Sequence, residues 1–125
     1  MTRKASIFLV PLLLAVGGCT KKVYVEAKYS RVGVVVNFFK DSQQKYKSTV
    51  CVWSLKINRS NDDKELINLQ SKDYCVEIQS IVINDQQHAM QMSGSLGLLR
   101  GSGKVYVELV GNGQRGRSDD FEALD

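Results

Sequence analysis

Residues 49–58, Thr-Val-Cys-Val-Trp-Ser-Leu-Lys-Ile-Asn, decide the fold class of this chain. Successive residues of a β-strand point to opposite faces, and this segment has a cysteine or a large apolar residue at every second position. One face of the predicted strand carries Cys51, Trp53, Leu55 and Ile57. The other face carries Val50, Val52, Ser54 and Lys56. The segment therefore predicts a strand with one face in a core.

The sequence on both sides continues as short β-rich segments separated by polar and glycine-containing turns. Residues 31–39 are mostly apolar, which predicts a central strand instead of a solvated one. Residues 64–69 predict a short edge strand. Residues 73–84 predict a long strand with a bulge near Gln79 and Ser80, where the alternation breaks. Further β-rich segments occupy residues 23–29, 88–99 and 104–110.

About seven such strands predict an all-β domain, namely a small antiparallel two-sheet sandwich. An immunoglobulin-like topology and a small open barrel are both compatible with this pattern.

The N-terminus has three parts in the order of a bacterial export signal. Arg3 and Lys4 form a positive flank, and residues 5–16 are almost entirely apolar. A membrane-spanning helix needs roughly 20 apolar residues, so this run is too short for a permanent span. Residues 16–19, Val-Gly-Gly-Cys, follow and resemble the lipobox of bacterial lipoproteins.

This resemblance implies that residues 1–18 are a lipoprotein signal peptide and that Cys19 is acylated after their removal. Residues 19–22 would then form a lipidated tether. Thr20 follows the cysteine, whereas enterobacterial lipoproteins kept at the inner membrane carry Asp at that position. The implied destination is the outer membrane, with the protein lipid-anchored on its periplasmic face, and no cofactor besides the lipid is expected.

Composition indicates one small domain of modest charge. Removing the signal peptide leaves about 107 of the 125 residues, enough for one domain, which we expect at 23–117 with an acidic tail at 118–125. The net charge of +4 falls to +2 once the two cations of the signal peptide are lost, too little to favour nucleic acid as a partner. Lys21 and Lys22, beside the lipid, are expected to lie against anionic headgroups.

Cys51 and Cys75 remain once Cys19 is assigned to the lipid. An even pair in an oxidising compartment predicts a disulfide. Closing a loop of about 25 residues would stabilise the fold by roughly 3–4 kcal/mol in the chain-entropy model.

Residues suited to hydrolytic catalysis are sparse. His88 is the single histidine, and no serine lies in a Gly-x-Ser-x-Gly elbow. We therefore expect a non-enzymatic protein.

His88, Met90 and Met92 form the sharpest ligand-like pattern in the chain. On a strand they would face one way, and one imidazole with two thioethers suits Cu(I). The same spacing suits packing of Met90 and Met92 in the core, in line with Leu96 and Leu98, with His88 at the solvent-exposed end of the strand. We prefer the packing interpretation and keep a periplasmic copper-binding lipoprotein as an alternative.

The size and organisation of the chain resemble the lipoprotein pilotins and secretion-system lipoproteins that have small β folds. This resemblance implies a protein that binds an envelope protein and assists the assembly or targeting of its complex, such as a secretion pore or a fimbria. Residues 51–55, Cys-Val-Trp-Ser-Leu, also resemble part of the immunoglobulin-like accessory proteins of curli assembly, which is the second alternative.

The acidic C-terminal segment is the expected place for a partner contact. Ser118 is a suitable N-cap, so a single helical turn is predicted to begin there. Phe121 and Leu124 would share one face of that turn and would contact the partner.

Overall fold

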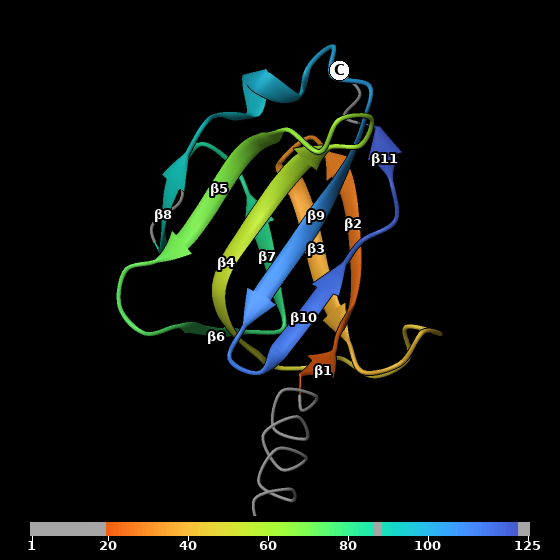
Figure 1. Ribbon diagram of the computed structural model, residues 1–125, viewed down its shortest axis with the longest axis vertical. Coiled ribbons are helices and arrows are strands. Elements are labelled where there is room, and N and C mark those ends of the chain that lie inside the picture. Colours follow the sequence, from red (N-terminus) through yellow and green to blue (C-terminus); the bar gives the residue numbers. More distant parts are fainter. Residues whose placement is uncertain (1–19, 87–88, 123–125) are drawn as a thin grey trace, which may run out of the picture.

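Two β-sheets form the fold, and their inner faces enclose the core (Figure 1). The computed structural model describes residues 20–86 and 89–122. This architecture confirms the predicted all-β, two-sheet sandwich. Within the described part, no helix is long and apolar enough to cross a bilayer.

The small sheet has the strand order β2-β3-β7, with antiparallel pairing throughout. Its strands are β2 (Tyr24–Ser30), β3 (Gly33–Phe39) and β7 (Ser80–Ile83). The central position of β3 confirms the prediction made from its apolar run.

The large sheet has the order β1-β10-β9-β4-β5-β8, and two shorter strands extend it. β6 pairs with β4 below β5, and β11 pairs with β9 above β10 (Figure 1). All pairs are antiparallel except β1 with β10. The strands are β1 (Lys21–Lys22), β4 (Val50–Arg59), β5 (Glu65–Ser71), β6 (Val76–Ile78), β8 (Met90–Ser93), β9 (Lys104–Gly111), β10 (Gln114–Arg117) and β11 (Phe121–Glu122).

The chain passes from the large sheet to the small one at Val23 and again at Gln79. The bulge predicted near Gln79 and Ser80 is wrong, because β6, which ends at Ile78, belongs to the large sheet and β7, which begins at Ser80, belongs to the small one. Alternation breaks at this point because the inward side of one sheet faces opposite to the inward side of the other. The crossing is held by the Phe38 N–H, which donates to the Gln79 carbonyl oxygen at 3.0 Å.

Three further segments differ from their predictions. The strand predicted at an edge is β5, which has β4 and β8 on its two sides. Within residues 88–99, the structure forms β8 and a short 3-10 helix, η1 (Leu96–Leu99). In place of the helical turn predicted from Ser118, Phe121 and Glu122 form β11.

Pairing explains the last difference. β10 covers β9 only from Glu108 to Gly111, so the start of β9 keeps a free edge. Phe121 pairs there with Val105, and Glu122 with Lys104. Backbone groups on a strand edge need partners, and this need outweighs the local preference for a helical turn. Phe121 and Glu122 therefore belong to the large sheet.

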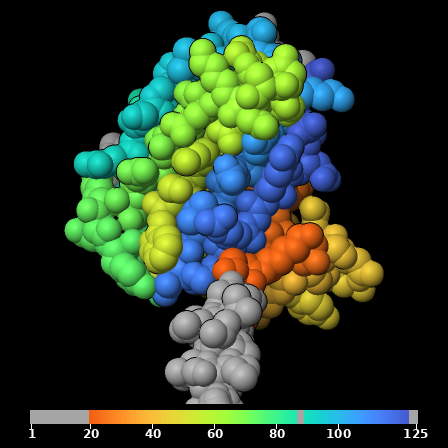
Figure 2. Space-filling model, in the orientation of Figure 1, coloured from red at the N-terminus to blue at the C-terminus, as the bar shows by residue number. Residues whose placement is uncertain are grey.

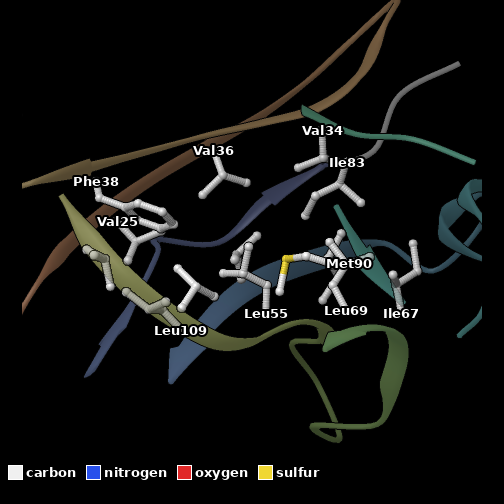
Figure 3. Close-up of a cluster of buried hydrophobic side chains, with 14 of the residues drawn as sticks. Val25, Val34, Val36, Phe38, Leu55, Ile67, Leu69, Ile83, Met90 and Leu109 are labelled. Carbon is white, nitrogen blue, oxygen red and sulfur yellow. The ribbon is translucent and has the colours of Figure 1, made fainter. Parts of the chain in front are cut away.

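The core lies between the sheets and is entirely apolar at its centre. Figure 3 shows Val34, Val36 and Phe38 of the small sheet facing side chains of the large one. Fully burying an aliphatic or phenyl side chain stabilises a fold by about 1.5–3 kcal/mol. The largest fully buried members include Phe38, Leu55, Ile57, Ile67, Leu69, Ile83, Met90, Leu99 and Leu109.

Candidate functional site

A disulfide marks the lower end of the large sheet. Cys51 lies on β4 and Cys75 directly precedes β6, with their Sγ atoms at disulfide distance and their Cα atoms 5.3 Å apart. This confirms the predicted pair. Since β6 also pairs with β4, the bond fastens the loop of residues 72–75 to the face of β4 that points away from the core.

Trp53 follows the disulfide on β4, and a β-bulge turns it outward. Val52 pairs with Gly111 and Ser54 with Val110, which leaves Trp53 as the extra residue on its strand. A bulge of this kind shifts the alternation by one residue. The prediction that Cys51 and Trp53 share one face with Leu55 and Ile57 is therefore wrong. Trp53 is 40% exposed.

The inward residues of β4 follow from the same shift. Val50 and Val52 are buried before the bulge, and Leu55 and Ile57 are buried after it. The alternation of inward and outward side chains along β4 thus shifts by one residue at the bulge. The outward side chains on this part of the strand are those of Cys51, Trp53 and Ser54.

Tyr74 comes from the loop and meets Trp53 on this outer face. The two ring centroids lie 6.4 Å apart, and their planes are inclined by 63° in an edge arrangement. The Ser71 hydroxyl holds the loop by lying 3.2 Å from the Asp73 carbonyl oxygen and 3.1 Å from that of Tyr74. Tyr74 is 64% exposed, so both rings of this aromatic pair are accessible to solvent.

Shallow hollows surround the aromatic pair. One of about 490 Å³ is lined by Trp53, Ser54, Gln70, Ser71, Asp73, Tyr74 and Val110. A second of about 710 Å³ shares Gln70 with it and extends over β5 and β8 to Asn68, Lys72, Asp85, Met90, Gln91, Met92 and Ser93. Apolar rings bordered by amides and hydroxyls can stack and form hydrogen bonds. Such a surface suits recognition of another molecule.

A polar cluster lies on the same outer face, nearer the opposite end of β9. The Arg117 guanidinium lies over the Tyr106 ring, 3.6 Å from its centroid. The Tyr106 hydroxyl donates to Asp63 at 2.9 Å, and Asn58 donates to Glu108 at 3.3 Å. Burial raises the pKa of Tyr106, and the nearby Asp63 carboxylate acts in the same direction. These contacts cover an outward-facing tyrosine that is only 5% exposed, so we assign them a structural role.

The methionines proposed as metal ligands point into the fold. Met90 is 1% exposed within the core, and Figure 3 shows its sulfur among Leu55, Leu69 and Ile83. Met92 is half-buried and packs against the same core. His88 lies outside the described residues. Among the residues that are described, no group of three His, Cys, Asp or Glu side chains is placed to hold a metal ion.

The remaining sequence-derived sites divide between described and undescribed residues. Phe121, proposed as a partner contact, is half-buried and packs against the core of its own domain. Leu124 and the lipidation site Cys19 lie outside the described residues.

Sequence reasoning missed the aromatic pair because it placed Trp53 on the same strand face as Leu55 and Ile57. One signal was available, since Tyr74 immediately precedes the second cysteine and Trp53 lies two residues after the first. A disulfide between the cysteines brings the backbone at these two aromatic residues close together.

Comparison with known proteins gives no relative of this chain. No family model, no curated protein and no solved structure matches it.

Proposed function

We propose that this chain is a non-enzymatic lipoprotein, anchored through Cys19 on the periplasmic face of the outer membrane, which binds an envelope protein during assembly or targeting of its complex. The observation that carries the binding role is the exposed aromatic pair, Trp53 and Tyr74. Tryptophan and tyrosine are enriched among the residues that dominate protein–protein binding energy. Two such rings, fixed by a disulfide and a serine hydroxyl, form a surface that needs little further ordering on binding.

The shape of the site favours a macromolecular partner. Its hollows are shallow and lie on the open face of a sheet, whereas small-molecule sites are usually concave and bury most of their ligand. The border of the aromatic pair is polar, with Gln70, Ser54 and Asp73 around Val110. An apolar centre with a polar rim is the usual anatomy of a protein interface.

The proposed anchor restricts where the partner is met. Lys21 begins β1 only two residues after Cys19, and an extended chain advances at most about 3.6 Å per residue. The domain would therefore remain against the membrane, and a partner would have to come to that surface. A pore or fibre subunit assembled at the outer membrane meets this requirement.

Site-specific photocrosslinking in cells tests the binding role. A photoreactive phenylalanine analogue at Tyr74 should give a discrete product with an envelope protein, identified by mass spectrometry. The product should disappear when Trp53→Ala is added. The control position is Val32, which is 61% exposed at the other end of the fold and should give no such product. Equal products from both positions, or a Tyr74 product unaffected by Trp53→Ala, would overturn the proposed site.

Metabolic labelling with a fatty acid tests the anchor separately. The unaltered chain should incorporate the label, and Cys19→Ser should not. Label retained by the Cys19→Ser chain would exclude this anchor while leaving the crosslinking result to be judged by itself.

A further inference from the structure

We infer that the end of the sandwich where the chain enters the fold is a membrane-docking surface for anionic lipid headgroups. This inference rests on the proposed lipid anchor and adds how the domain is oriented on the membrane. The surface, called the basic end below, consists of six exposed cations and one exposed tyrosine. They are Lys21, Lys22, Lys40, Lys45, Lys47, Arg115 and Tyr46.

Strand pairing makes the basic end continuous although its residues are distant in sequence. Arg115 of β10 pairs with Lys22 of β1, and the Lys22 Nζ lies 5.0 Å above the centroid of the Tyr24 ring. Tyr24 pairs in turn with Phe39. On the other side of Phe39, the Lys47 Nζ lies 5.9 Å from that ring's centroid. A row of three cations and two aromatic rings thus runs from β10 to the loop after β3.

A hollow in this surface has the charge expected of a headgroup site. It measures about 350 Å³ and is lined by Thr20, Lys21, Lys22, Glu108, Leu109, Arg115, Gly116 and Arg117. Three of its cations, Lys21, Lys22 and Arg115, form no ion pair with the described part of the chain, whereas Arg117 is paired with Asp120 and Glu108 is a carboxylate. Thr20 lies at its rim, so the hollow opens beside the point where the proposed tether joins the domain.

The loop of residues 40–47 carries the rest of the basic end and is internally fixed. The Asp41 carboxylate accepts hydrogen bonds from the backbone N–H of Lys45 at 3.1 Å and of Tyr46 at 3.0 Å. The Tyr46 N–H is the largest influence holding the pKa of Asp41 below its usual value. The Lys40 N–H also donates to the Tyr46 carbonyl oxygen at 2.8 Å.

This loop stands out from the sandwich beside β1, as the yellow-orange lobe next to the orange strand in Figure 2 shows. Tyr46 is 66% exposed there. Tyrosine side chains concentrate at membrane interfaces, where the ring reaches the apolar boundary and the hydroxyl stays hydrated. Tyr46 is therefore placed to enter the headgroup region beside the lysines.

The cations at the two ends of the molecule differ in their ion pairing. Among the described residues, none of the six cations of the basic end forms an ion pair. At the opposite end, acidic side chains gather around the turn after β4 and the segment before β11, which the hydrogen bond from Ser60 to Asp120 joins at 2.9 Å. They are Asp62, Asp63, Asp119, Asp120 and Glu122. Two of these carboxylates are neutralised by ion pairs, Asp62 with Arg59 and Asp120 with Arg117. An anionic surface would therefore attract the cations of the basic end, unpaired within residues 20–86 and 89–122, in preference to the opposite end, and it would orient the domain with its basic end down.

Fluorescence quenching in vesicles tests this orientation. Trp53 is the single tryptophan, so the lipidated protein with Trp53→Phe and Tyr46→Trp reports from the basic end alone. We expect quenching by brominated lipids in vesicles containing phosphatidylglycerol and little quenching in phosphatidylcholine vesicles. At 1 M NaCl, where the Debye length is about 3 Å, the quenching should be largely lost.

Two triple variants in that background test the residues. Lys40→Gln, Lys45→Gln and Arg115→Gln remove three charges from the basic end without altering the lipobox. The matched control, Lys28→Gln, Lys64→Gln and Lys104→Gln, removes three charges elsewhere. The docked population relative to the free one should fall by about fivefold for each charge lost from the basic end and change little in the control. Equal losses in both variants would overturn the assignment of this surface.

Flotation of the same vesicles separates failure of docking from failure of the anchor. Protein that floats in high salt, but whose tryptophan at position 46 is never quenched, is anchored without docking, and the inference is then wrong. A basic end that faces a protein instead of lipid would give the same negative result. Protein that does not float in high salt lacks the anchor, and the proposed function then fails.

Discussion

Val25 of β2 and Ser118 form a parallel bridge that joins the small sheet to the large one along one side of the sandwich. Ser118 is only 4% exposed and occupies the gap between β10 and β11. Its N–H donates to the Val107 carbonyl oxygen, and its hydroxyl oxygen accepts from the Val107 N–H, both at 2.9 Å. One residue thus satisfies both backbone groups of Val107 where the neighbouring strands leave them unpaired.

Ser118→Ala should destabilise the domain by about 1–3 kcal/mol, because the buried Val107 N–H loses its acceptor. Urea denaturation of the two proteins measures this difference. Ser60→Ala, which removes an exposed hydrogen bond to Asp120, is the control and should have a much smaller effect. Equal stability of the Ser118→Ala and unaltered proteins would contradict the role given to this hydroxyl.

Gly116→Ala should destabilise the domain by pushing β10 away from Val23, the residue that follows β1. A β-carbon at position 116 would overlap the Val23 carbonyl oxygen and crowd the Val25 side chain. Overpacking of this kind costs about 1–3 kcal/mol. Gly97→Ala is the matched control, since its nearest contact would be the Ser95 hydroxyl at 3.7 Å. If both variants melt at the same temperature, this close approach does not limit the packing of β10.

Replacing Cys51 and Cys75 together by alanine should lower stability by roughly 3–4 kcal/mol, given the 24-residue separation of the pair. The loop that carries Tyr74 should also become mobile, which would change the fluorescence of Trp53. Thiol titration of the unaltered protein under denaturing, non-reducing conditions is the accompanying control. Two reactive thiols besides Cys19 would contradict the disulfide.

Met90→Ala should cost about 2–5 kcal/mol, because it leaves a cavity between the sheets. Met92→Ala should cost less, since Met92 is only half-buried. Calorimetry with Cu(I) provides the contrasting measurement. Tight binding that both variants abolish without loss of stability would restore the copper hypothesis and contradict the packing role.

Acid should loosen the turn after β4 before the domain unfolds. The Arg59 side chain, 2.8 Å from Asp62, lowers the pKa of that carboxyl to about 2 from its ordinary value of 3.8. A pKa lowered by folding means that the contribution to stability is complete above 3.8 and is lost as the pH falls toward 2. Hydrogen exchange of the Lys64 amide, which donates to Asp62, should therefore quicken in that range, and Asp62→Asn should abolish the change. Intrinsic exchange rates also depend on pH, so the measured rates are corrected for them. If the corrected exchange rate of the Lys64 amide does not change between pH 3.8 and about pH 2, the stabilising role given to the Asp62 carboxylate is wrong.

The fold class was predictable because alternation and turn composition are local properties of the sequence. The bulge at Trp53 was not, because it depends on the strand opposite. A β-carbon at position 111 would lie 2.7 Å from the Cys51 carbonyl oxygen, so Gly111 permits the close approach that accompanies the bulge. This glycine is 60 residues from Cys51 in the chain, and only the pairing of β4 with β9 shows its role.

The same distinction applies to the candidate sites. Cys51 and Cys75 could be paired from the sequence, since two cysteines allow one partner each. The exposure of Trp53 could not be predicted without the bulge, and the exposed position of Tyr74 depends on the loop that the disulfide holds. The basic end was visible only as Lys21 and Lys22, because the crossing at Val23 and the β2–β3 pairing bring the loop of residues 40–47 alongside them.

The parallel pairing of β1 with β10 has a mechanical consequence. The Lys21 N–H donates to the Gly113 carbonyl oxygen at 2.8 Å, and the Val23 N–H donates to the Arg115 carbonyl oxygen at 2.7 Å. Both hydrogen bonds therefore carry any tension that is applied to the chain at residue 20. Tension along the strand axis loads them in shear, and they must break together instead of opening one after the other. The strand that resists, β10, is the second arm of a hairpin whose first arm is β9 in the middle of the large sheet. A force arriving at the start of the domain is therefore borne first by its C-terminal hairpin, and the core is reached only after these bonds fail.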